Sequence, residues 1–233
     1  MNSDLRFPPF HLSPYICGMN TSLPILIELH YFPTIQYCSK FFSHPTLILE
    51  QHENYVKRSY RNRAHIATAN GPLRLSIPLE KGKNQQQSIR EVRISYEENW
   101  QTKQWTAICS AYGNAPFFEY YVDDIQPLFQ EKTTFLFEHN LKVLNALFFV
   151  LDFKPSIQLS QNYLTAPYDG ISDFRNQISP KNGESILDKT YQNIPYQQVF
   201  AQKNGYLPNL SILDLIFCKG PETLSILENS VIE

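Results

Sequence analysis

Glycine is scarce in this chain, with 8 in 233 residues. No Gly-x-x-x-x-Gly-Lys-Ser/Thr run, no Gly-x-Gly-x-x-Gly after a predicted strand and no Gly-x-Ser-x-Gly elbow is present. These absences argue against a P-loop nucleotidase, a dinucleotide-binding domain and an α/β-hydrolase. If the protein binds phosphate, lysine and arginine side chains must hold it in place of a glycine-rich loop.

Cysteines are also few. The four are Cys17, Cys38, Cys109 and Cys218. They share no close spacing and are too sparse for a disulfide framework or a cysteine zinc site, so the sequence predicts a reduced, cytoplasmic protein. The apolar run over residues 23–29 is interrupted by Pro24 and Glu28 and falls short of the ~20 residues of a membrane span. We therefore expect no membrane span.

Neither sign of charge dominates, because 20 Lys and Arg face 22 Asp and Glu for a formal net charge of -2. Such a balance excludes non-specific attraction of the whole surface to nucleic acid or anionic lipid. With 42% hydrophobic and 18% charged residues, the chain should fold around a sizeable core. The sequence identifies neither a cofactor nor an oligomeric state.

The first part of the chain reads as a β-α-β unit with a hairpin. Residues 25–29 and 46–49 are short apolar runs typical of buried strands, and Thr34 can cap a helix between them. The pair Asn70-Gly71 separates two further runs, 65–69 and 73–79, which is a strong hairpin signal. Residues 89–94 alternate as a half-exposed strand would.

Helical patterns follow. They predict helices over 99–112, 117–130 and 134–151, and a last helix capped by Asn209 or Ser211 that ends near Gly220. The fold class is thus α/β, with an N-terminal β-α-β sheet and hairpin, about three helices and a mixed C-terminal segment. We expect residues 1–22 to be a poorly structured extension, 23–221 a single domain (23–98 sheet-rich, 99–152 helical, 153–221 C-terminal) and 222–233 a tail.

A cation-rich block follows the second predicted strand. It contains Lys57, Arg58, Arg61 and Arg63. Ligands of open α/β sheets gather at the carboxyl ends of strands, and guanidinium groups bind carboxylate or phosphate bidentately. The block therefore predicts an anionic small-molecule substrate, such as a sugar phosphate or nucleotide sugar, although a solvated charged loop is the plain alternative.

Acid–base groups lie near this block. His30 follows the first strand, and Glu50 and His52 follow the second, so all three are candidate catalytic residues. The remaining candidate substrate-binding residues are Tyr31, Asn54 and Asn62. A histidine at a strand end is more often a structural hydrogen-bonding group, and the histidine spacing favours no metal site.

Several segments together resemble the WbqC-like family of bacterial proteins, from about residue 23 to 221. The segments that carry the resemblance are Tyr31-Phe32-Pro33, Ile35-Gln36-Tyr37, the block 57–63, Leu75-Ser76-Ile77-Pro78-Leu79 before Lys81-Gly82, Asn99-Trp100 with Trp105, Ser110-Ala111-Tyr112-Gly113, Ala115-Pro116-Phe117-Phe118 and residues 205–215. Their order and spacing agree along the chain.

The resemblance implies a link to O-antigen and other surface-polysaccharide gene clusters, and a suggested transfer of an amino-acid or acyl group to a sugar. Many members have Gln-Pro before the aromatic pair and Asp-Asp after the second strand, where this chain has Leu29-His30 and Glu50-Gln51. A role that needs a pair of carboxylates at these places is weakened by that departure.

Two other functions compete with a transferase. The same basic loop and the aromatic segment 117–121 would suit a non-catalytic module that binds a sugar nucleotide or a partner enzyme. A nucleotidyl transferase ranks last, because the paired-histidine spacing expected after the first strand is missing.

Overall fold

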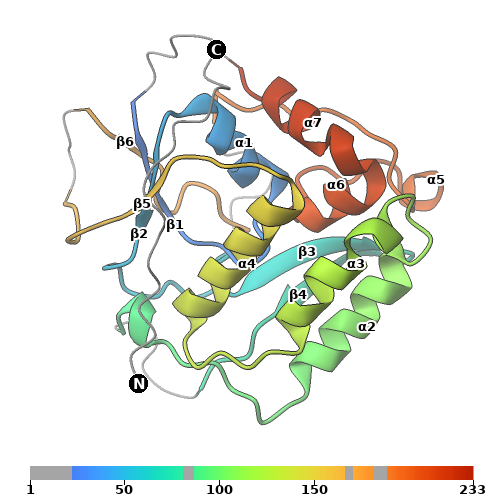
Figure 1. The fold of residues 1–233 in the computed structure, drawn as a ribbon, viewed down its shortest axis with the longest axis horizontal. Helices are drawn as coiled ribbons and strands as arrows, with labels where there is room; N and C mark the ends of the chain where they lie inside the picture. Colours follow the sequence, from blue (N-terminus) through green and yellow to red (C-terminus); the bar gives the residue numbers. More distant parts are fainter. Residues whose placement is uncertain (1–22, 81–86, 166–169, 181–187, 233) are drawn as a thin grey trace.

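A four-stranded parallel sheet with the strand order β5-β2-β1-β6 forms one side of the protein in this computed structural model. The structure describes residues 23–80, 87–165, 170–180 and 188–232; the predicted extension 1–22 lies outside them. A separate two-stranded antiparallel hairpin, β3–β4, lies between the sheet and the helices α2 and α3 (Figure 1). The α/β class predicted from the sequence is confirmed.

The strands of the parallel sheet are short and are joined by the predicted β-α-β unit. Their bounds are Ile25–Glu28 (β1), Leu47–Glu50 (β2), Ile157–Leu159 (β5) and Ser172–Asp173 (β6). Helix α1, Ile35–Ser43, connects β1 to β2, and its first turn is capped by the Thr34 hydroxyl, which accepts a hydrogen bond from the Tyr37 N–H. All four residues of β1 are buried, which explains its continuous apolar run.

The predicted hairpin is present as β3 (Arg63–Thr68) and β4 (Gly71–Ser76), joined at Asn70-Gly71. Gly71 has φ +96°, a backbone conformation that glycine adopts without strain. Along β3, Ala64 and Ile66 are buried while Arg63 and His65 face outward. One face of the hairpin therefore belongs to the core and the other is accessible to ligands.

The three predicted central helices are present as α2, α3 and α4. Their bounds, with those of the C-terminal helices, are Trp100–Tyr112 (α2), Phe118–Ile125 (α3), Leu136–Val150 (α4), Ala201–Asn204 (α5), Ile212–Lys219 (α6) and Thr223–Asn229 (α7). Helix α3 is shorter than expected because the chain tightens into a 3₁₀ turn at Gln126–Phe129, where Pro127 supplies no backbone donor. Ser211, not Asn209, caps α6.

One expectation needs correction. Residues 89–94 are not a strand: Ile89–Glu91 is a 3₁₀ turn, and the rest makes only isolated bridges, Leu79 to Ile94 and Arg93 to Phe135. The alternation of the sequence matches the alternating burial of these side chains, but no described strand lies alongside to form a ladder with them. Within the segment expected to be a tail, residues 223–229 form α7, which packs against α1.

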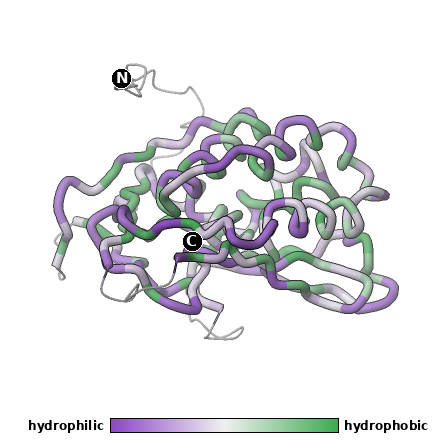
Figure 2. Tube along the Cα trace, turned by 90° about the horizontal axis from the view of Figure 1, so that it is seen from below, coloured by the Kyte–Doolittle hydropathy of each residue, from purple (hydrophilic) through white to green (hydrophobic). Residues whose placement is uncertain are grey.

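The core joins these elements into one buried cluster that extends from the sheet to α6. Hydrophobic residues recur along the whole trace (Figure 2), and no described helix has the length and apolarity to cross a membrane. Buried Asp214 of α6 accepts hydrogen bonds from Tyr112, Tyr196 and Gln198. This carboxylate ties α6 to α2 and to the segment before α5.

Gly220 offers a test of the packing between α6 and α3. It ends α6 with φ +51°, and a Cβ placed on it would collide with the Phe117 ring. Gly205 also has a positive φ, +71°, but nothing lies within 4 Å of the corresponding position.

We therefore expect Gly220→Ala to lower the free energy of unfolding more than Gly205→Ala does. Both variants carry the backbone cost of about 1–3 kcal/mol, and the collision adds about 1–3 kcal/mol to Gly220→Ala alone. Urea unfolding of the two variants measures the difference, and equal losses would contradict this packing.

Candidate functional site

The carboxyl ends of all four parallel strands meet at one edge of the sheet. Glu28 ends β1 and Glu50 ends β2, and the two residues are register partners. Ser160 follows β5, while Arg175 follows β6. In open parallel sheets this edge is where ligands bind, and here it carries two clusters of buried charge.

The first cluster centres on Arg61, whose side chain is fully buried. Its Nε donates to Glu53 Oε1 at 2.6 Å and its Nη2 donates to Glu53 Oε2 at 2.5 Å. Nη2 also donates to Asn176 Oδ1 at 3.0 Å, and Nη1 lies 3.5 Å from Glu28 Oε1. Arg61 thus connects β1, the loop after β2 and the loop after β6.

Glu28 is held ionised in this cluster. Burial alone opposes its ionisation, but the Arg61 charge, the His30 ring and the Asn176 N–H lower its pKa to about 2. The Asn176 N–H donates to Glu28 Oε2 at 2.9 Å. A carboxylate this acidic is suited to orient an N–H or O–H group rather than to remove a proton from it unaided.

His30 lies behind Glu28 and is fully buried. Its Nε2 is 3.2 Å from Glu28 Oε1, and burial lowers the pKa of the imidazole despite that carboxylate. The ring is therefore neutral near pH 7, and because a carboxylate only accepts, Nε2 carries the proton. Nδ1 then has a free lone pair with no hydrogen-bond partner in the described part of the chain.

The second cluster centres on Arg175. Its guanidinium binds Asp173 through Nε at 2.9 Å and Nη2 at 2.6 Å, and its Nη1 reaches Glu50 Oε2 at 3.1 Å. The other Glu50 oxygen accepts from the Ser160 hydroxyl at 2.7 Å and from the His52 N–H at 2.8 Å. Both carboxylate oxygens of Glu50 therefore already have hydrogen-bond partners within the fold.

A pocket of about 320 Å³ opens beside the first cluster. Its lining residues are Glu28, Val56, Arg58, Ser59, Arg61, Asn176 and Ser179. Arg61 Nη1 is buried, lies 3.5 Å from Glu28 Oε1 and makes no hydrogen bond to a described residue, so its N–H groups have capacity left for a ligand. The pocket therefore combines a fixed carboxylate with two guanidinium groups.

Two residues of this pocket have left-handed backbones. Arg58 has φ +60° and Asn176 has φ +61°. Asparagine tolerates this conformation, but for arginine it is strained, and such strain persists where the surrounding structure holds a residue in place. The fold therefore holds Arg58 at the pocket although its backbone conformation is locally unfavourable.

The structure brings some predicted residues to the pocket and places others elsewhere. Arg58 and Arg61 line it, and His30 contacts it only through Glu28. Lys57, His52 and Asn54 are exposed outside its lining.

Of the other predicted binding residues, Tyr31 and Asn62 serve the fold and Arg63 lies outside the pocket. The Tyr31 hydroxyl donates to Gln104 in the core, and Asn62 accepts from the Tyr55 hydroxyl. Arg63 lies on β3, on the outer face of the hairpin.

Sequence reasoning missed Glu28 and Asn176 as site residues. Glu28 counted only as an interruption of an apolar run, although a charge at the end of a buried strand, two residues before a histidine, was a usable signal. Asn176 lies in a segment without periodicity, and only the fold brings it beside Arg61. The sheet also pairs Glu28 with Glu50, so it restores a carboxylate neighbour that the family comparison had counted as lost.

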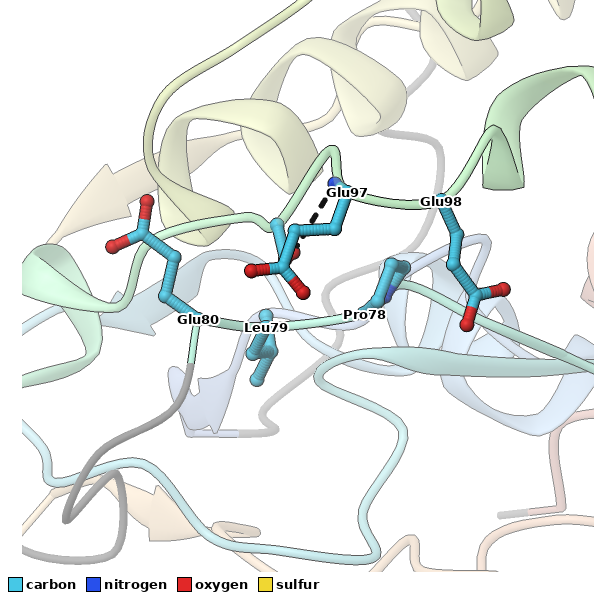
Figure 3. A pocket seen from close by; sticks show the side chains of 6 residues that line it. Pro78, Leu79, Glu80, Glu97 and Glu98 are labelled. Atoms are coloured by element: carbon cyan, nitrogen blue, oxygen red, sulfur yellow. Dashed lines mark hydrogen bonds between the residues drawn. The ribbon is translucent and has the colours of Figure 1, made fainter.

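A second pocket, of about 360 Å³, lies at the surface near residues 78–80 and 95–98 (Figure 3). Its Glu98 pairs with Lys103 and its Glu80 with Arg93. Within the described residues, no group of three or more His, Cys, Asp and Glu side chains is placed to hold a metal ion. The edge of the sheet is therefore the better candidate site.

Comparison with known proteins agrees with the resemblance to the WbqC-like family that the sequence segments showed. The model of the WbqC-like protein family matches residues 29–226. The uncharacterized protein Rv1507c of Mycobacterium tuberculosis (strain ATCC 25618 / H37Rv) is 25% identical over 219 residues, which covers 84% of this chain and 94% of that protein. No solved structure matches the chain.

The lowered pKa of Glu28 predicts how stability depends on pH. A depressed carboxyl pKa contributes stability that is present above pH 4.5 and is lost as the pH falls toward about 2. We expect Glu28→Gln to cost about 3 kcal/mol of unfolding free energy at pH 7, and the difference from wild type to shrink below pH 4.5.

Urea unfolding at pH 7, 5 and 3.5 measures this difference, with the exposed Glu138→Gln as a control for a lost surface charge. A gap that stays constant or widens on acidification would show that Glu28 is not held ionised by Arg61.

Proposed function

The chain belongs to the WbqC-like protein family, and on that premise we propose that it is a group-transfer enzyme that acts on an activated, anionic sugar. In this proposal it moves an amino-acid or acyl group during the synthesis of surface polysaccharide such as O-antigen, in the cytoplasm. The observation that supports an anionic ligand is the pairing of two guanidinium groups in one pocket: Arg58, and buried Arg61, whose Nη1 makes no hydrogen bond among the described residues.

Arg58 and Arg61 would divide the binding work. Arg61 is neutralised by Glu28 and Glu53, so it supplies a directed hydrogen bond rather than net charge. Arg58 makes no ion pair with a described residue and lies at the pocket, so it supplies the net positive charge for a phosphate or carboxylate. Two arginines with different roles would therefore bind the anion, in place of the four equivalent cations expected from the sequence.

Glu28, supported by His30, would orient the acceptor of the transferred group. Glu28 orients an N–H or O–H of the acceptor, whose lone pair attacks the activated carbon of the donor group. A bond forms to that carbon, the leaving group departs with the electron pair of the bond that breaks, and the acceptor proton passes to water in the open pocket. The neutral imidazole, which donates its Nε2 proton to Glu28, keeps that carboxylate ionised and in position for this orienting role.

A non-catalytic binding module remains the second candidate. Its support is that His30 does not line the pocket and that both oxygens of Glu50 are bonded within the fold. An enzyme should lose turnover in Glu28→Gln while it still binds its sugar ligand, whereas a binding module shows no turnover in either form.

The test of the proposed ligand uses the strain at Arg58. We expect Arg58→Gly to leave the unfolding free energy unchanged or raised by up to about 1 kcal/mol, because glycine relieves the positive φ. Binding of the anionic ligand should fall tenfold or more, because the unpaired charge at the pocket is gone.

The measurement is a thermal-shift panel of sugar phosphates, nucleotide sugars, amino acids and acyl carriers, repeated on Arg58→Gly and on the surface control Lys103→Gln. A ligand at 100 times its dissociation constant should add about 2.7 kcal/mol of stability. The proposal fails if no anionic member of the panel stabilises the wild type, or if Arg58→Gly responds as wild type does.

A further inference from the structure

The outer face of the hairpin carries three basic side chains that lie close together, which we call the hairpin cationic face: Arg63, His65 and Arg74. His65 and Arg74 are directly opposite each other in the β3–β4 register, so their side chains project to the same side. Arg63 is two residues before His65 and therefore shares that side. Arg74 is exposed, and the other two are half-buried.

Within the part of the chain that the structure describes, no acidic side chain forms an ion pair with this face. Among the described residues, the guanidinium groups of Arg63 and Arg74 make no hydrogen bond or ion pair, and Arg63 Nε is buried without a partner. Burial and the charges of Arg74 and Arg63 lower the pKa of His65, so the like charges are those of Arg63 and Arg74, which are diagonal neighbours on the two strands and repel each other. An uncompensated cluster in a chain of net charge -2 is best explained by an anionic ligand that it binds.

The face lies near the pocket at the edge of the sheet. The Arg63 pKa is lowered by burial, by the Arg74 charge and, to a smaller extent, by the charge of Arg58, and the Tyr60 ring packs between the two regions, 5.8 Å from the His65 ring and 5.4 Å from the His30 ring behind Glu28. Arg58, which lines the pocket, belongs to the same turn as Tyr60. A ligand group bound at Arg58 can therefore have a neighbouring group over the hairpin.

We propose that the hairpin cationic face binds the second phosphate of a diphosphate ligand whose first phosphate is held at Arg58. This inference rests on the proposed function and deepens it, because it names a diphosphate rather than a monophosphate as the activating group. A monophosphate would leave Arg63 and Arg74 without a partner. A long polyanion is disfavoured by the small size of the face and the net negative charge of the chain.

The test compares inorganic pyrophosphate with inorganic phosphate at equal ionic strength by calorimetry. We expect the wild type to bind pyrophosphate at least tenfold more tightly. Arg74→Gln should lose most of that preference while it keeps phosphate affinity, and its melting temperature should stay equal or rise because a like-charge contact is removed. Lys103→Gln, which removes a paired surface charge, should behave as wild type.

The outcomes separate the two proposals. If Arg74→Gln keeps the full pyrophosphate preference, the hairpin inference is wrong, whereas the pocket can still bind phosphate through Arg58. If Arg58→Gly keeps phosphate binding, the pocket assignment is wrong, and a loss of pyrophosphate affinity in Arg74→Gln still supports the hairpin. Tighter binding of a short single-stranded oligonucleotide than of pyrophosphate would overturn the diphosphate assignment.

A nucleoside diphosphate, measured in the same way, identifies the source of the group. Affinity above that of pyrophosphate shows that the diphosphate belongs to a nucleotide, and equal affinity shows that the protein reads the diphosphate alone. Affinity for the nucleoside diphosphate no better than for phosphate would contradict the inference.

Discussion

The candidate site depends on one buried arrangement, the Arg61 guanidinium between Glu28 and Glu53. Placing an arginine in the interior is costly unless carboxylates and hydrogen bonds compensate it, and here both are present. The ion pairs join residues from β1, from the loop after β2 and, through Asn176, from the loop after β6. They close the carboxyl end of the sheet and fix the charges that line the pocket.

Arg175, at the same edge of the sheet, is likewise paired with two carboxylates. It bonds to Asp173, Glu50 and the Leu164 carbonyl, so it joins the ends of β6 and β2 to the loop after β5. Because Glu28 and Glu50 are register partners, two neighbouring carboxylates are each assigned to a different arginine. Buried ion pairs therefore fix the side chains at this edge of the sheet, and groups held in fixed positions are what orients a substrate.

Charge is distributed unevenly around this edge. The buried arginines are paired with carboxylates, while Arg58 and the arginines of the hairpin cationic face make no ion pair with a described residue. A ligand that brings its anionic groups to these unpaired cations and an N–H or O–H group to Glu28 matches both kinds of charge. An activated sugar with a nucleophilic acceptor has that combination of groups.

Local signals in the sequence determined the β-α-β unit, the hairpin at Asn70-Gly71 and the central helices, because apolar periodicity and turn residues act over short distances. Only the tertiary structure decided which charges are used. The sequence shows Arg58, Arg61 and Arg63 as equivalent cations, whereas folding buries Arg61, leaves Arg58 at the pocket and turns Arg63 onto the hairpin. The burial of Arg61 depends on Glu28 and Asn176, which lie 148 residues apart in the sequence and are brought together by the pairing of β1 with β6.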